Sequence, residues 1–176
     1  CKAKRIVIEP RGINVDPLSS PSLCFQMDYE LLCNLRFPAP EKEWCKAWKD
    51  AERNVENKFD HAFKKELPRF EGKLIYLLSQ HMPRNAILHV GNSMPIRDLE
   101  WFWQPGKRNR KLLGNRGVNG IDGTISTALG IAHKSDTPTY LVTGELAFLH
   151  DSNALLFNKQ FQGSLTVFLI NNQGGG

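Results

Sequence analysis

The feature that most restricts the fold of this chain is the regular alternation of apolar and helical segments after residue 69. The apolar segments are five or six residues long and rich in Leu, Val and Ile, which is typical of buried strands. Strands that alternate with helices of about ten residues form βαβ units, and such units build a parallel sheet. We therefore expect an α/β fold with a doubly wound parallel sheet. The expected strands are 86–91, 111–115, 139–144 and 165–170, and the expected helices are 70–81, 95–103, 124–133 and 147–158.

The preceding residues predict a different organisation. The segment RIVIEP (5–10) is typical of a buried strand, and a short helix is expected over 28–35. Between 41 and 65, apolar side chains recur at steps of three and four among charged residues, which predicts one amphipathic helix. Packing against its own domain is the better interpretation of that helix, with partner binding as the alternative. Its apolar face consists of Trp44, Trp48, Ala51, Val55, Phe59 and Phe63.

Composition argues against several classes of protein. The net charge is +5, and the basic residues form only short clusters such as 107–111, which are typical of solvated loops rather than of a nucleic-acid face. No apolar run approaches the roughly 20 residues needed to span a bilayer. The four cysteines lie within the first 45 residues without a CxxC pair, which favours reduced thiols in a cytosol-like compartment over a zinc site. Because the chain begins with Cys1 and ends in a glycine run typical of a site, we expect a fragment.

The predicted strands all end in polar or glycine-rich sequence. Ligands of such sheets bind outside the carboxyl ends of the strands. One glycine-rich strand end is weak support for a site, but here four of them are expected along the same rim. The four strand ends are GNS at 91–93, NRGVNGIDG at 115–123, GEL at 144–146 and NNQGGG at 171–176.

Glu145 and Asn172 are the candidate side-chain ligands of a metal ion. Glu145 follows the glycine that ends one strand, and Asn172 lies 27 residues later, just after the next strand. A strand–helix–strand unit of that length returns the chain beside its start, so both side chains can face one ion. With a backbone carbonyl such as that of Gly174, they leave room for phosphate oxygens in an octahedral Mg²⁺ shell. A helix that begins near Leu146 directs backbone N–H groups at the same phosphates.

The sequence around these residues resembles that of a known family. The combination of GNSMPIRDLEWF, NRGVNGIDGTISTALG, GELAFLHDSNALL and LINNQGGG is similar to the 2-succinyl-5-enolpyruvyl-6-hydroxy-3-cyclohexene-1-carboxylate (SEPHCHC) synthases, the MenD family of thiamine diphosphate enzymes. The similarity is dense over 86–176 and thin over 1–69. It implies that 1–37 is the carboxyl-terminal tail of a middle α/β domain and that 38–68 is a connecting amphipathic helix. Residues 69–176 correspond to most of the diphosphate-binding domain.

The resemblance also implies cofactors and ligands. Thiamine diphosphate is bound through Mg²⁺ or Mn²⁺, with Glu145, Asn172 and the Gly174 carbonyl as metal ligands. Ile121 is the bulky residue under the cofactor that keeps it bent, which brings its aminopyrimidine nitrogen against the reactive carbon. The other implied cofactor-binding residues are Asn92, Gly120, Gly144 and Leu146.

The implied reaction is the decarboxylation of 2-oxoglutarate and the addition of the succinyl unit to isochorismate, in menaquinone or phylloquinone biosynthesis. Both substrates carry several carboxylates, which suit guanidinium groups. By the resemblance, Ser93, Arg97 and Arg116 face these substrates. The family also implies a homodimer or homotetramer that is cytoplasmic, or plastidic in a plant or alga. No nucleic-acid partner and no membrane span are expected.

The sequence departs from the family pattern and leaves other interpretations open. Glu145 stands where aspartate is usual, and its longer arm can weaken or shift the metal; Gln173 stands where asparagine is more usual. Nothing in the chain matches the family's pyrimidine-binding domain, so we expect the isolated fragment to be inactive. The alternatives are a thiamine diphosphate enzyme for another 2-oxo acid and a non-catalytic homologue. Arg97 taken alone reads as a helix surface residue, and the neighbours His150 and Asp151 cannot face each other as a catalytic dyad in a helix.

Overall fold

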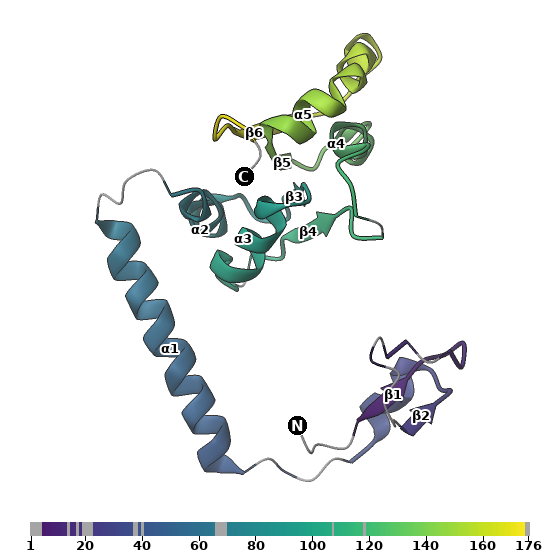
Figure 1. Ribbon diagram of the computed structural model, residues 1–176, viewed down its shortest axis with the longest axis vertical. Coiled ribbons are helices and arrows are strands. Elements are labelled where there is room, and N and C mark those ends of the chain that lie inside the picture. The colour runs from purple at the N-terminus through teal and green to yellow at the C-terminus, as the bar shows by residue number, and fades with distance from the viewer. Residues whose placement is uncertain are drawn as a thin grey trace. The chain divides into compact units, whose positions relative to one another are not determined.

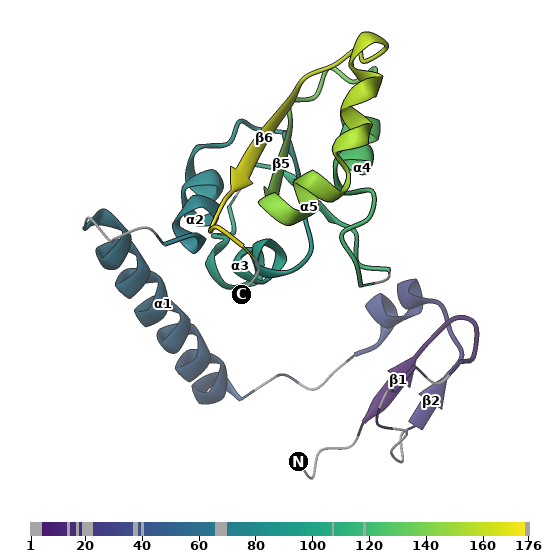
Figure 2. The ribbon, with the colours of Figure 1, turned by 45° about the horizontal axis from the view of Figure 1, so that its top comes forward.

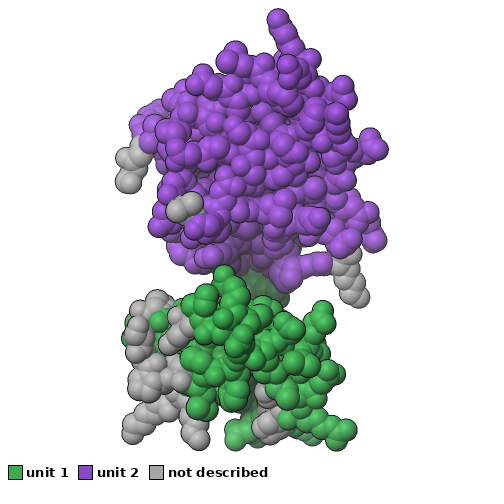
Figure 3. All heavy atoms as spheres, turned by 90° about the vertical axis from the view of Figure 1, so that its right-hand side faces the viewer, with its two compact units in different colours: residues 1–58 green, residues 59–176 purple. Residues whose placement is uncertain are grey.

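The computed structural model describes residues 5–13, 15–16, 18, 23–36, 39, 41–65, 70–106, 108–117 and 119–174. The chain forms two compact units, residues 1–58 and residues 59–176 (Figure 3). The predicted domain boundary at 68/69 lies outside the described residues, as do Cys1 and the last two glycines.

Unit 1 contains a small parallel sheet of two strands, β1 (Ile6–Ile8) and β2 (Leu23–Phe25), and a 3₁₀ helix, η1 (Tyr29–Asn34) (Figure 1). The expectation of a buried strand at 5–10 is only partly right. The strand is present, but Ile6 is 59% exposed and its partner strand β2 was not expected. Each strand has only three residues and one neighbour, so little of its apolar surface is covered.

Helix α1 (Lys42–Lys64) confirms the amphipathic helix expected at 41–65. At its carboxyl end the rings of Phe59 and Phe63 contact Phe102, with ring centroids 5.4 and 5.9 Å apart, and Phe63 also contacts Tyr76 at 4.6 Å. The Tyr76 hydroxyl donates a hydrogen bond to Asp60, which raises the pKa of Tyr76 to about 12. The apolar face of α1 is therefore packed at this end, whereas its Trp side chains nearer the amino end are exposed.

Unit 2 is built on four parallel strands in the order β4-β3-β5-β6 (Figure 1). Each expected strand is present, with ends that shift by one residue at most. This confirms the expectation of a parallel α/β fold. The strands are β3 (Ile87–Val90), β4 (Lys111–Gly114), β5 (Thr139–Gly144) and β6 (Leu165–Ile170).

Helices cover both faces of this sheet, as a doubly wound fold requires (Figure 2). On one face, α2 (Gly72–His81) and α3 (Met94–Phe102) pack against Leu88, Val90 and Val142. On the other face, α4 (Thr124–Ala132) packs against Leu141, and the segment after β5 adds Phe148 and Ala154 to the same cluster. Side chains alternate between the faces along a strand, so neighbours such as Leu141 and Val142 serve different cores.

The prediction of a single helix at 147–158 is wrong in detail. The segment folds as α5 (Glu145–His150) and a 3₁₀ helix, η2 (Ser152–Lys159), separated at Asp151 with φ −110° and ψ 22°. Helix α5 thus starts two residues earlier than expected and places Glu145 in its first turn. Among the described helices, none is both long and apolar enough to cross a bilayer.

The basic cluster near residue 110 is more than a solvated loop. Arg110 donates hydrogen bonds to the carbonyls of Ser79 and Met82, and its guanidinium lies 5.6 Å from the centroid of the Trp103 ring. Arg108 donates to the carbonyl of Gln80 at 2.5 Å. These groups satisfy carbonyls at the end of α2 that have no partner within the helix. Lys107 lies outside the described residues.

His89 is packed in the sheet, as expected, and is 1% exposed. Both ring nitrogens lack a hydrogen-bond partner among the residues that the structure describes. Burial lowers the pKa of His89 from its ordinary value of 6.5, because a charged ring is poorly solvated there. The neutral ring is therefore the form compatible with the folded sheet.

We predict that His89 makes the fold sensitive to mild acid. The unfolded chain binds a proton at this side chain below about pH 6.5 and the folded chain does not, so stability is complete above that pH and falls below it by at most about 1.4 kcal/mol per pH unit. Urea denaturation of wild type and His89→Leu at pH 7.5 and 5.5 measures this difference. The variant should lose less stability on acidification. Replacing the exposed His61 by Leu is the control, and equal pH dependence of wild type and His89→Leu contradicts the prediction.

Candidate functional site

The strand order places a crevice between β3 and β5. The connection after β3 leads to α3 on one face of the sheet, and the connection after β5 leads to α5 on the other face. At such a switch point the two loops diverge and leave a gap at the carboxyl ends of the strands. The loop at 91–93 and the segment at 144–146 are the two sides of this gap, and both were predicted to form the rim of a site.

A cavity of about 410 Å³ occupies this gap. Asn92 and Ser93 line it from the β3 side, Gly144 and Glu145 from the β5 side, and Asn172 from the end of β6. The structure thus brings together strand ends that are far apart in the sequence. The other lining residues are Glu71, Met94, Pro95, Ile121, Leu146, Ala147 and Ile170.

A second cavity of about 390 Å³ lies beside the first, and Asn92, Ser93 and Ile121 line both. Arg97 and Arg116 line this second cavity and give it two positive charges. Arg97 is an exposed residue of α3 and also lines this cavity, so it is both a helix-surface residue and a residue of the rim. The remaining lining residues of the second cavity are Ile96, Glu100, Asn119 and Gly120.

Asn92 connects the two loops that carry these groups. It is 9% exposed; its Nδ2 donates to Gly120 O at 2.5 Å, and its Oδ1 accepts from Arg116 Nη1 at 3.2 Å. A nearly buried amide needs its hydrogen bonds, because leaving them unmade costs free energy. Asn92 therefore fixes the loop after β4 against the loop after β3 and holds the guanidinium of Arg116 at the edge of the second cavity.

Three backbone positions in these loops have positive φ: Ser93, Gly120 and Gly123, the last with φ 65°. Ser93 has φ 72° and ψ −130°, a region that residues with a Cβ rarely occupy, and such outliers cluster at functional sites. Gly120 has φ 156°, and a Cβ there would lie 2.9 Å from Asp122 Oδ2. Because the exposed Asp122 carboxylate can move away, glycine is favoured before Ile121 by the positive φ rather than by lack of space.

The predicted metal ligands lie together at the end of β6. Glu145 Oε1 accepts a hydrogen bond from Gly174 N at 2.9 Å. One end of the Asn172 carboxamide lies 2.7 Å from Gly174 O and 3.2 Å from Glu145 Oε1. With its nitrogen at that end, Asn172 donates hydrogen bonds to both oxygens.

With the amide oxygen at that end instead, it lies close to the oxygens of both Gly174 and Glu145. Neighbouring ligands in an octahedral Mg²⁺ shell with bonds of 2.0–2.1 Å are roughly 2.9 Å apart, close to the separations observed here. The donor set is therefore compatible with a hard divalent cation. The described part of the chain has no cluster of three or more His, Cys, Asp or Glu side chains placed to hold a metal. A cation at this rim would therefore need amide and carbonyl oxygens beside the carboxylate of Glu145.

Three acidic residues near the cavities were not anticipated from the sequence. Glu71 lines the first cavity and Glu100 the second. Asp98 is 3% exposed, and its Oδ2 has no hydrogen-bond partner within the described ranges. Burial, and then the nearby charge of Glu71, raise the pKa of Asp98. No strand-end pattern marks these residues, because α2 and α3 bring them to the rim through packing.

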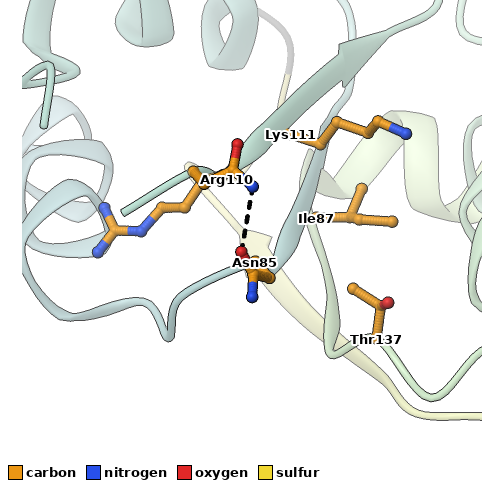
Figure 4. A pocket seen from close by; sticks show the side chains of 6 residues that line it. Asn85, Ile87, Arg110, Lys111 and Thr137 are labelled. Atoms are coloured by element: carbon orange, nitrogen blue, oxygen red, sulfur yellow. Dashed lines mark hydrogen bonds between the residues drawn. The ribbon is translucent and has the colours of Figure 1, made fainter. Parts of the chain in front are cut away.

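The opposite edge of the sheet contains a smaller pocket, of about 250 Å³, at the amino ends of the strands (Figure 4). Ile87, Lys111 and Thr137 line it, and a hydrogen bond from Asn109 to Asn85 (3.2 Å) borders it. The guanidinium of Arg110 points away from Ile87, Lys111 and Thr137, toward the carbonyls at the end of α2 (Figure 4). None of the predicted site residues lines this pocket, so the carboxyl-end rim is the stronger candidate.

Fold and site together define a doubly wound α/β domain with a ligand site at its switch point. A scan against protein-family models gives no match. Curated proteins named 2-succinyl-5-enolpyruvyl-6-hydroxy-3-cyclohexene-1-carboxylate synthase are similar to this chain over nearly all of its length. The proteins of Acaryochloris marina, Synechococcus elongatus and Thermosynechococcus vestitus are 41%, 43% and 43% identical over 99%, 98% and 96% of the chain.

This chain is similar to these synthases over nearly all of its length, which confirms the family resemblance found in the sequence motifs. It spans only about three tenths of the length of these relatives: 31%, 29% and 30%.

We predict that Asn92 is the polar residue on which the rim depends most. Asn92→Ala should destabilise the protein by about 1–3 kcal/mol, because it removes the bonds to Gly120 and Arg116. Asn92→Asp should cost at least as much, since it places a carboxylate oxygen against the Gly120 carbonyl. Chemical denaturation measures both effects, with Ala at the exposed Asn153 as control. A loss below about 0.5 kcal/mol in both Asn92 variants would show that the bridge contributes little.

Proposed function

We propose that residues 69–176 are most of the diphosphate-binding domain of a synthase that depends on thiamine diphosphate and Mg²⁺ or Mn²⁺, and that the preceding residues are the end of a middle domain and a connecting helix. In this proposal the whole enzyme is a transferase that decarboxylates 2-oxoglutarate and adds the remaining succinyl unit to isochorismate, in menaquinone or phylloquinone biosynthesis. It acts as a homo-oligomer of a longer chain. The relatives' name and the identity of about 40% support this assignment.

The observation that carries the proposal is that two cavities with different chemistry lie side by side and share Asn92, Ser93 and Ile121. The first has the oxygens of Glu145 and Asn172 beside the start of a helix. The second has two arginines. A cofactor that ends in a diphosphate and reacts with carboxylate substrates needs both environments next to each other.

The residues of the first cavity bind and orient the cofactor. Glu145, Asn172 and the carbonyl of Gly174 hold the divalent cation, which neutralises the diphosphate. Gly144 and Leu146 contribute backbone groups at the start of α5, and Ile121 supports the cofactor where the two cavities meet. When bound, thiamine diphosphate supplies the electron sink for the loss of CO₂.

The residues of the second cavity select the substrate. Arg97 approaches it from α3, which follows β3, and Arg116 approaches it from the loop after the adjacent strand β4. Planar guanidinium groups bind carboxylates with two parallel hydrogen bonds. Asn92 holds Arg116 in place, so less side-chain freedom is lost when an anion binds. Ser93 adds a hydroxyl at the boundary of the cavities.

The metal assignment predicts opposite outcomes for two substitutions of Glu145 in the full-length protein. Glu145→Asp should preserve or tighten Mg²⁺-dependent binding of thiamine diphosphate, because the shorter arm suits octahedral geometry. Glu145→Ala should abolish it. Calorimetry with Mg²⁺ and with EDTA measures the affinity. If the Ala variant retains normal metal-dependent binding, Glu145 is not a ligand. If wild type binds no thiamine diphosphate, the chain is a non-catalytic homologue.

The substrate assignment predicts a specific kinetic loss for Arg97→Ala and Arg116→Ala. Removing one partner of a desolvated charge pair costs about 2–5 kcal/mol. This corresponds to a fall in kcat/KM of roughly thirty-fold to a few thousand-fold. Affinity for thiamine diphosphate should hardly change, and Arg→Lys should recover only part of the loss.

Steady-state kinetics with 2-oxoglutarate and isochorismate tests this prediction, with Ala at the exposed Arg84 as the control. Wild-type turnover in both variants would remove the substrate site from this cavity. Loss of thiamine diphosphate binding would instead assign the arginines to the cofactor. Efficient turnover of a different 2-oxo acid would favour a related enzyme of the same cofactor class.

A further inference from the structure

Asp151 lies between α5 and η2, outside the two cavities of the proposed site. Its carboxylate accepts a hydrogen bond from Ser126 N at 2.7 Å and another from Ser126 Oγ at 3.0 Å. Ser126 is 25 residues away in the sequence, in the first turn of α4. The contact therefore joins two helices that flank the proposed site.

Helix α4 needs an acceptor at this position. The N–H groups of a helix's first turn have no partner within the helix, and a side chain at the N-cap normally accepts from one of them. The N-cap of α4 is Gly123, which has no side chain, and the first turn has no acidic residue. Asp151 supplies the missing acceptor and a negative charge at the positive end of the helix.

The same helix start supports Ile121. The hydroxyl of Thr124, the first residue of α4, donates to Ile121 O at 2.9 Å, and Thr124 is 2% exposed. A displacement of the first turn therefore moves the residue that lines both cavities.

Asp151 is also connected to α5, the helix that begins at Glu145 on the other side of the site. It directly follows this six-residue helix, and its backbone N–H donates to Ala147 O at 3.3 Å. A second contact between the same segments joins His150 Nε2 and Asp122 Oδ1 at 3.9 Å. Both of its side chains are at least half exposed, so this pair adds little.

We propose that Asp151 is a positioning residue that holds the start of α4, and with it Ile121, in register with the helix that carries Glu145. Its consequence for catalysis rests on the proposed function, but the contact itself does not. The separation of α5 from η2 at Asp151 has a role in this scheme, because it directs the carboxylate toward α4.

The test compares Asp151→Ala and Asp151→Asn in the full-length protein without ligands. Hydrogen exchange of the backbone amides in 122–127 should be about fivefold faster in the Ala variant, as for loss of a helix cap. The Asn variant keeps an acceptor for Ser126 N and a donor for Ser126 Oγ, so its exchange should stay close to wild type. Asp136→Ala is the control, because Asp136 is exposed just beyond the other end of α4. Unchanged exchange in the Ala variant overturns the proposal.

Kinetics of the same variants separates positioning from simple stabilisation. With Mg²⁺ and thiamine diphosphate, Asp151→Ala should lower kcat per folded molecule about 10- to 100-fold, because small misplacements near the chemistry have effects of this size. The KM for 2-oxoglutarate should stay within about threefold, and Asn should rescue kcat. A lower unfolding midpoint with unchanged kcat overturns the positioning role. If wild type itself has no synthase activity, the proposed function fails, and hydrogen exchange alone then decides whether Asp151 holds the start of α4.

Discussion

The order in which strands are added to the sheet reverses at β3: β4 lies on one side of β3, and β5 lies on the other. The site in unit 2 depends on this reversal. Parallel strands at the centre of a sheet need apolar cover on both faces, so helices must leave the strands toward both sides. Where two neighbouring strands send their helices to opposite faces, the sheet's end cannot be closed by packing. The cavity between Asn92 and Glu145 is a consequence of this geometry.

The polar residues around that gap are held by hydrogen bonds that cross between loops. Asn92 joins the loop after β3 to Gly120 and Arg116 of the loop after β4. Glu145 at the start of α5 joins Gly174 beyond β6. Each bond links residues more than 20 positions apart, so the rim acts as one unit only when the sheet has formed. The arrangement leaves some polar groups poorly satisfied, since the nitrogens of His89 and one oxygen of Asp98 have no hydrogen-bond partner among the described residues.

An element was predicted correctly from the sequence when it is long and when neighbouring elements bury its apolar side chains. Strands such as 139–144 have six residues and neighbours on both sides, so their apolar pattern is strong and their position was predicted. The three-residue strand at Leu23–Phe25 has a single neighbour and mostly exposed side chains, and no apolar pattern reveals it. The break at Asp151 was missed for another reason. The segment 147–158 has ordinary helix-forming composition, and the contact from Asp151 to Ser126 that accompanies the break is tertiary.

The sequence by itself determined the class of fold, the family resemblance and the residues expected at the rim, because these depend on local periodicity and on short motifs at strand ends. Only the tertiary structure decided which of these residues share a cavity, how Asn92 connects them, and that Glu71, Asp98 and Glu100 lie close by. The physical reason is that periodicity specifies which side of an element is buried, whereas distances between loops depend on strand order. In this chain β3 lies beside both β4 and β5, and that adjacency brings Arg116, Ser93 and Glu145 to one rim.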